Sequence, residues 1–165
     1  MRSIRDKLTW LFAASVSMFA TLCSAATTTT TFTVQMTITA SCTIVSASTL
    51  DFGSQGVLTA NVDQTSTVQV QCTNTTPYNI GLNAGTGAGA TVATRKMTSG
   101  GATINYSLYN NIARTTVWGD TVGTDTVSAT GNGALQSYTV YGRVPAQTTP
   151  APGTYSDTIT VTVTF

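Results

Sequence analysis

The sequence predicts an all-β fold, organised as a single β-sandwich domain. Apolar and polar residues alternate with a period of two in many short segments, as in half-buried strands. Glycine, proline and asparagine residues separate these segments at short intervals. No window after residue 26 has the apolar period of a helix. Many short strands with turn residues between them are typical of a sandwich.

The first 26 residues have the organisation of a cleaved secretory signal peptide. Basic residues come first, an apolar stretch over residues 8–22 follows, and small residues suited to signal peptidase end at Ala26. A membrane anchor is the alternative, but the stretch is too short and too interrupted by Ser and Thr to span about 30 Å of bilayer. We therefore expect export, cleavage after residue 26, and no membrane insertion afterwards.

Charged residues are few, and this limits the possible functions. The chain has 7 Lys and Arg, 6 Asp and Glu, and no His. Such a chain has no electrostatic footprint for nucleic acid. Without His or Glu, acid–base catalysis would depend on scattered Asp residues, and no metal-ligand cluster is present. We therefore predict no enzymatic activity, no cofactor, no metal and no nucleic-acid partner.

Two cysteines remain after residue 26, Cys42 and Cys72. An even number of cysteines in an exported chain predicts a disulfide. Closing a loop of this length would stabilise the fold by roughly 3–4 kcal/mol. The alternative, two free buried thiols, is disfavoured by the oxidising compartment.

The first segment of the exported chain combines a Thr run with a strict alternation. Apolar residues then fall on one face, and Thr and Gln fall on the other. This pattern predicts a half-buried strand, which could pair within its own chain or complete a neighbouring chain. Four inward side chains would contribute on the order of 6–12 kcal/mol gross to the groove that they fill. The inward residues are Phe32, Val34, Met36 and Ile38.

Further strands are predicted along the rest of the chain. Turn and loop residues lie between them, at Gly85–Gly89, Gly131–Gly133 and Pro145–Pro152. The predicted strands are 43–45, 50–52, 66–73, 78–82, 103–110, 115–118, 135–144 and 155–165.

The last predicted strand alternates apolar residues with Thr up to the final residue of the sequence. A sandwich with an open apolar edge is prone to aggregation, so such an edge needs a complementary strand. The inward side chains of this strand are Ile159, Val161, Val163 and Phe165.

Three motifs allow both a functional and a structural interpretation. Asp51-Phe52-Gly53 is interpreted as a strand-end turn rather than a ligand loop, because Gly supplies a positive φ. Arg95-Lys96-Met97 is interpreted as a solvated turn beside a core Met. Trp118, with Tyr109 and Tyr141, is interpreted as core rather than as a sugar-stacking platform.

The order and spacing of these motifs resemble those of the spore coat protein U domain family, which includes the Csu-type (archaic) chaperone–usher pilins. The resemblance covers about Phe32 to Phe165. It is carried by Ser41-Cys42-Thr43, Asp51-Phe52-Gly53, Val70-Gln71-Cys72-Thr73, Pro77-Tyr78-Asn79-Ile80, Arg95-Lys96-Met97, Tyr106-Ser107-Leu108-Tyr109, Trp118-Gly119-Asp120, residues 138–145 and Gly153-Thr154-Tyr155-Ser156-Asp157-Thr158.

The resemblance implies an incomplete immunoglobulin-like sandwich that is finished by a donor strand from another molecule. It implies three regions: a signal peptide at 1–26, a donor extension at 27–38 and a sandwich domain at 39–165. Phe32, Val34 and Met36 would be inserted side chains, while Ile38 would begin the subunit's own first strand. Ile159, Val161, Val163 and Phe165 would wall the acceptor groove, and the Cys42–Cys72 bridge would tie the first strand to an inner one.

The resemblance also implies a mechanism and partners. A periplasmic chaperone would lend a strand, and an outer-membrane usher would exchange it for the donor strand of an identical or related subunit, head to tail. We expect a structural subunit of a surface fibre with a role in adhesion or biofilm formation. The alternatives are a monomeric binding module, carbohydrate-binding or adhesin-like, and a spore or capsule coat protein.

Overall fold

The computed structural model describes residues 24–165, which form antiparallel strands and contain no helix. Backbone contacts divide the chain into two units, Met1–Met36 and Thr37–Phe165. The predicted signal peptide lies outside the described residues except for its last three. Among the described residues, no helix long and apolar enough to cross a membrane is found.

A five-stranded sheet forms one layer of the second unit. Its strand order is β1 (Cys42–Ala47), β2 (Val62–Cys72), β7 (Leu135–Val144), β5 (Ala102–Tyr109) and β4 (Arg95–Ser99). The central β2–β7 ladder pairs ten consecutive residues, from Val62–Val144 to Gln71–Leu135. The predicted strand 135–144 coincides with β7, and β2 begins four residues before its predicted start at residue 66.

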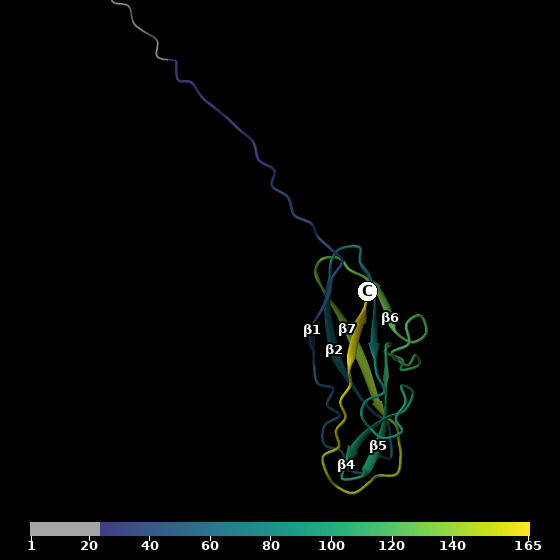
Figure 1. Cartoon of the computed structure of the whole chain (residues 1–165). Coiled ribbons are helices and arrows are strands. Elements are labelled where there is room, and N and C mark those ends of the chain that lie inside the picture. Colours follow the sequence, from purple (N-terminus) through teal and green to yellow (C-terminus); the bar gives the residue numbers. More distant parts are fainter. Residues whose placement is uncertain (1–23) are drawn as a thin grey trace, which may run out of the picture. The chain divides into compact units, whose positions relative to one another are not determined.

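A three-stranded sheet forms the other layer, in the order β6 (Val127–Thr130), β3 (Pro77–Leu82) and β8 (Val161–Thr164). The edge strands β1 and β8 lie near each other but share no hydrogen-bond ladder. Within this unit, the C-terminus lies at the end of the sandwich opposite to β4 (Figure 1). The predicted all-β sandwich is therefore confirmed, with one side where an edge of each sheet stays unpaired.

The core lies between the two sheets, mostly at inward positions of the strands, and Phe52, Leu58 and Trp118 join it from outside the strands. Tyr78 on β3 and Tyr138 on β7 join the two layers, because their hydroxyl oxygens lie 2.6 Å apart. Burial, followed by this hydrogen bond, raises the pKa of Tyr78. The buried apolar residues are Phe52, Leu58, Val68, Val70, Cys72, Tyr78, Ile80, Leu82, Tyr106, Leu108, Trp118, Val140 and Val144.

Trp118 is core, as predicted, with 1% of its surface exposed, whereas Tyr109 and Tyr141 are half-buried and lie outside the core. Its indole Nε1 donates to Ile80 O on β3 at 2.8 Å, and its backbone N donates to Leu108 O on β5 at 2.9 Å. The side chain and backbone of this residue therefore bond to both sheets, and the buried indole cannot serve as a sugar platform.

The interpretation of Arg95-Lys96-Met97 as a solvated turn is wrong. Arg95 lies in β4 and is 0% exposed. Its guanidinium donates to four carbonyl oxygens, at 2.7–2.8 Å, so the buried charge is solvated by backbone dipoles. Burial lowers the pKa of Arg95. The four acceptors belong to Asn83, Val92, Leu82 and Trp118.

Other predicted strands differ from the structure. Residues 50–52 form no strand, and residues 115–118 form one only as an isolated bridge between Val117 and Tyr109. Only residues Val161–Thr164 of the predicted strand 155–165 form a strand, β8. The earlier part of the segment instead makes an isolated bridge to β4, between Ser156 and Thr98. One alternating run therefore contacts both sheets in turn.

The N-terminal alternation does not form the predicted half-buried strand. Phe32, Val34 and Met36 are 86%, 82% and 85% exposed and belong to no strand. Ile38, expected to begin the first strand, is 73% exposed, and β1 begins at Cys42. Period two selects a face, but a strand also needs a neighbour for its backbone groups.

Candidate functional site

A groove with an apolar floor and partly polar walls lies between the segment that follows β1 and the segment that leads to β8. It consists of two adjoining cavities of about 690 Å³ and 460 Å³. Residues 47–58 line one side and residues 149–161 line the other. Both cavities are lined by Leu50, Asp51, Phe52, Met97 and Tyr155.

The floor of the groove is the core itself. The smaller cavity reaches Val68 on β2, Val140 on β7, Leu108 on β5 and Leu82 on β3, all of which are buried. The larger cavity reaches Val62, Met97, Ile104 and Val144. Because strands from both sheets meet at this floor, the groove opens directly between the layers.

Asp157 fixes the C-terminal wall of the groove. Its Oδ2 accepts from the Tyr106 hydroxyl at 2.7 Å, and its Oδ1 accepts from the Thr86 backbone N at 2.7 Å and hydroxyl at 2.8 Å. Burial alone would raise the pKa of Asp157, but the hydrogen bonds from Thr86, Tyr106 and Thr158 outweigh it and hold the pKa below its usual value. Burial, followed by the bond to Asp157, raises the pKa of Tyr106.

Two further contacts hold the same wall at its ends. Thr98 and Ser156 exchange backbone hydrogen bonds of 2.9 and 3.2 Å. The Asn83 carboxamide Oδ1 accepts from Thr160 N at 2.9 Å, just before β8 begins. The wall is thus bonded to β4 at one end and to the residue after β3 at the other.

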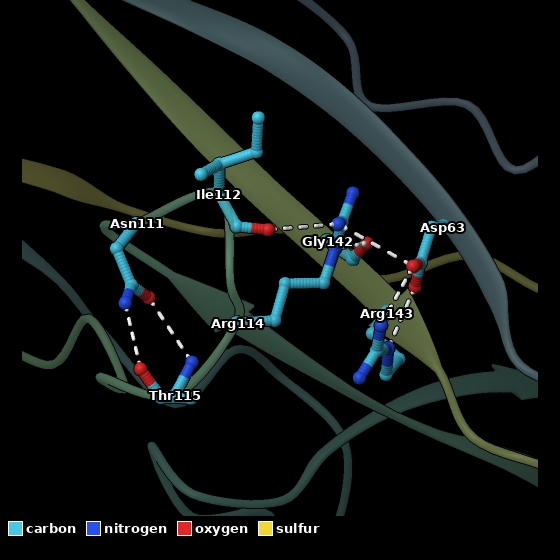
Figure 2. A network of polar contacts seen from close by, with 7 residues as sticks. All are labelled: Asp63, Asn111, Ile112, Arg114, Thr115, Gly142 and Arg143. Atoms are coloured by element: carbon cyan, nitrogen blue, oxygen red, sulfur yellow. Dashed lines mark hydrogen bonds and ion pairs between the residues drawn. The ribbon is translucent and has the colours of Figure 1, made fainter.

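A polar network joins β2, β7 and the turn after β5 (Figure 2). Arg143 donates to both carboxylate oxygens of Asp63 at 2.7 Å, and Arg114 reaches the same carboxylate at 3.3 Å. The Arg114 Nε also donates to Gly142 O at 3.2 Å. The hydrogen bond from Arg143, more than any other contact, lowers the pKa of Asp63. The network fixes the backbone of Gly142, whose inner side faces the groove wall residues Leu50 and Phe52.

The residues proposed as groove walls lie in different environments. Ile159 and Val161 line the smaller cavity. Val163 packs against the core without lining either cavity, and Phe165 is 60% exposed beyond the end of β8.

Sequence reasoning missed the opposite wall. The apolar residues scattered among the turn residues of segment 48–58 were the available signal, because turns rarely carry several large apolar side chains. The missed residues of this wall are Leu50, Phe52 and Leu58.

The predicted disulfide is confirmed between Cys42 and Cys72, with an S–S distance of 2.03 Å. The two residues are direct partners in the β1–β2 ladder. The bridge therefore joins the first residue of the edge strand to the last residue of an inner strand.

Among residues 24–165, no group of three or more His, Cys, Asp or Glu is placed to hold a metal ion. The fold and the groove define a disulfide-bridged β-sandwich with a groove between its two layers on one side.

The chain belongs to the Spore Coat Protein U domain family, whose model matches residues 28–162. It is 35% identical over 129 residues to Protein U of Myxococcus xanthus, covering 71% of this chain and 72% of that protein.

The fold is also similar to one chain in the crystal structure of the CsuC–CsuE chaperone–tip adhesion subunit pre-assembly complex, from the archaic chaperone–usher Csu pili of Acinetobacter baumannii. The TM-score is 0.57 and the identity is 29%, over 78% of this chain. The match spans 40% of that chain, so the present chain corresponds to less than half of its length.

Proposed function

We propose that this protein is a structural subunit of a chaperone–usher surface fibre that polymerises by donor-strand exchange. The supporting observation is the presence, in one chain, of an open groove with an apolar floor and an exposed alternating segment, residues 27–38. The donor segment of one subunit would enter the groove of the next. A heterologous contact of this kind generates a filament.

The donor segment and the groove walls contain similar numbers of residues. Phe32 to Ile38 would span about 20 Å as a strand and place four apolar side chains on one face. The smaller cavity is lined by residues 47–52 on one side and Tyr155–Ile159 and Val161 on the other, so each wall matches a strand of similar length. Ile159 and Val161 would contact the inserted side chains, and backbone groups of the two walls would pair with those of the inserted strand.

The partners follow from the same groove. A free subunit exposes apolar surface at an open edge, which favours aggregation. A periplasmic chaperone would cover this edge, and an outer-membrane usher would exchange the chaperone for the next subunit. The similarity to a subunit in a chaperone complex supports this proposal. The fibre would act at the cell surface, in adhesion or biofilm formation.

An unheated denaturing gel of the exported protein tests polymerisation. We compare the full chain with a chain lacking Thr27–Met36, and with a triple variant that makes the apolar donor face polar: Phe32→Ser, Val34→Ser and Met36→Ser. The proposal expects a ladder of multimers from the full chain that collapses on heating, and no ladder from either variant. Thr33→Ser, Gln35→Ser and Thr37→Ser, on the other face, are the matched control and should keep the ladder.

Monomer in every lane, together with cooperative thermal unfolding of the full chain, would contradict the fibre proposal. A ladder that survives the apolar-face substitutions would also contradict it, because polymerisation would then use another surface.

A further inference from the structure

The groove wall formed by residues 49–57 is attached to the sandwich in an unusual way. Ser48 N donates to Thr67 O at 2.9 Å, and Leu58 O accepts from Gln147 N at 3.0 Å. Between these two anchors, no backbone hydrogen bond joins residues 49–57 to another described strand or loop. The segment is therefore hydrogen-bonded to the sandwich at both ends, and its middle belongs to no β-ladder.

Side chains, rather than backbone bonds, hold the middle of this segment down. Phe52 is 9% exposed and packs edge-to-face on Tyr106, with ring centroids 6.3 Å apart. Leu50 and Phe52 fill the space beside Gly142, where a Cβ on that residue would lie 2.7–3.0 Å from their side-chain atoms. Because Gly142 has no side chain, Leu50 and Phe52 can pack against its backbone, and we call this position their seat.

The turn that presents Phe52 is locally closed. The Asp51 carboxylate accepts from Gly53 N at 2.8 Å, and the Gln55 amide donates to Phe52 O at 2.7 Å. Gly53 has a φ of +70°, which suits glycine. The turn can therefore keep its shape without help from the sandwich.

Leu50-Asp51-Phe52 also repeats the pattern of the donor segment. Apolar, polar and apolar residues alternate here as they do in Phe32-Thr33-Val34. Phe52 lines both cavities of the groove, so a strand inserted there would contact its ring.

We propose that residues 49–57 form a displaceable strap, and that Phe52 is an internal substitute for a donor side chain in the unassembled subunit. Insertion of a donor strand moves Phe52 out of its seat beside Gly142. The strap covers the core until a donor strand binds. The rate at which the strap is displaced then determines the rate of donor-strand exchange. This inference rests on the proposed function.

Thiol labelling tests the displacement. Phe52→Cys is introduced into the full exported chain that carries the polar donor face (Phe32→Ser, Val34→Ser, Met36→Ser), so that the groove is free. The probe is a synthetic peptide of residues 27–38, whose binding is measured separately by fluorescence anisotropy. If residues 49–57 are displaceable, saturating peptide should increase the rate of maleimide labelling at position 52 on the order of tenfold, because the thiol there changes from protected to accessible. Val57→Cys, in the same segment and 75% exposed in the native chain, should label equally with and without peptide.

The sign of the change separates the alternatives. If the peptide binds and labelling at position 52 falls or stays constant, residues 49–57 are a fixed wall and the strap is overturned, while the groove proposal stands. If the peptide does not bind, the proposed function fails, and the strap fails with it.

A milder variant tests the rate without an added thiol. Phe52→Leu should accelerate peptide association several-fold, because a smaller side chain leaves the seat more easily, whereas Val57→Ala should not change the rate. An association rate in Phe52→Leu that equals or falls below that of the native sequence would contradict the strap.

Discussion

The Tyr106 hydroxyl donates to the Asp157 carboxylate across 2.7 Å, and this bond joins the floor of the groove to its C-terminal wall. Tyr106 belongs to β5, and Asp157 lies in the segment that leads to β8. The Asp157 carboxylate accepts from four donors and is thus a central contact of this wall.

Removing this bond should destabilise the protein. Tyr106→Phe keeps the ring and deletes the donor, so we expect the free energy of unfolding to fall by about 1.5–3 kcal/mol, as for a hydrogen bond to a charged group. Urea denaturation measures it. Tyr155→Phe is the control, because its hydroxyl donates only to Ala151 O in an exposed turn. Equal losses in the two variants would contradict a special role for the pair.

Stability should depend on acid pH through Asp157. Its pKa is lowered in the folded state, so its contribution is fully present above the unfolded pKa of about 3.9 and is lost as the pH falls through the folded value. The free energy of unfolding should therefore decrease below about pH 4. Urea titrations across this range should show a smaller decrease in Asp157→Asn. Asp63, whose pKa is also lowered, titrates in the same range, so Asp63→Asn is measured in parallel.

Arg95 should be among the least replaceable residues. Arg95→Lys keeps the charge but cannot reproduce the fork that reaches four carbonyl groups, so we expect a loss of about 3 kcal/mol or more in unfolding free energy. Arg143→Lys, in a surface ion pair with Asp63, should cost under about 1 kcal/mol. Thermal and urea melts compare the two variants, and similar losses would refute the assignment of Arg95 to the core.

A side chain at Gly142 should strain the groove. In Gly142→Ala, the added methyl group would meet Leu50 and Phe52 at 2.7–3.0 Å, so we expect a loss of about 1–3 kcal/mol from overpacking. Gly56→Ala meets no atom within 4 Å and is the matched control. Unchanged stability in Gly142→Ala would mean that the two side chains are not seated there.

Replacing both cysteines by Ser should lower the free energy of unfolding by about 2–5 kcal/mol, since Cys42 and Cys72 close a long loop. Urea denaturation of Cys42→Ser/Cys72→Ser, beside the native protein with and without reductant, measures this loss. Equal stability of the double variant and the oxidised native protein would show that the β1–β2 ladder alone fixes the edge strand.

Strands with a regular apolar–polar alternation were predicted from the sequence, because this pattern is visible in consecutive residues. Features that depend on contacts between distant residues were missed. The alternation predicted β7 with its observed bounds because Tyr138, Val140 and Val144 all face inward. Arg95 was misassigned because its four acceptors come from residues up to 23 positions away, which no local pattern reveals.

The groove was predicted only on its C-terminal side, for a related reason. Ile159 and Val161 lie in a regular alternation, whereas Phe52 lies in a turn, and its burial depends on the absence of a side chain at Gly142. The strand β6 was missed because Val127–Thr130 is short and weakly apolar, and pairing with β3 supplies what its composition lacks.

The position of the disulfide has a mechanical consequence. A pulling force applied to the N-terminal segment reaches the sandwich at Cys42, where the bridge passes it to Cys72 at the end of β2. The load then lies along the ten-residue β2–β7 ladder, whose hydrogen bonds must be sheared together, rather than on β1, which would peel one bond at a time. A fibre made of such subunits would carry tension through the disulfide bridge and the central strands of each subunit, and the edge strands would bear little of the load.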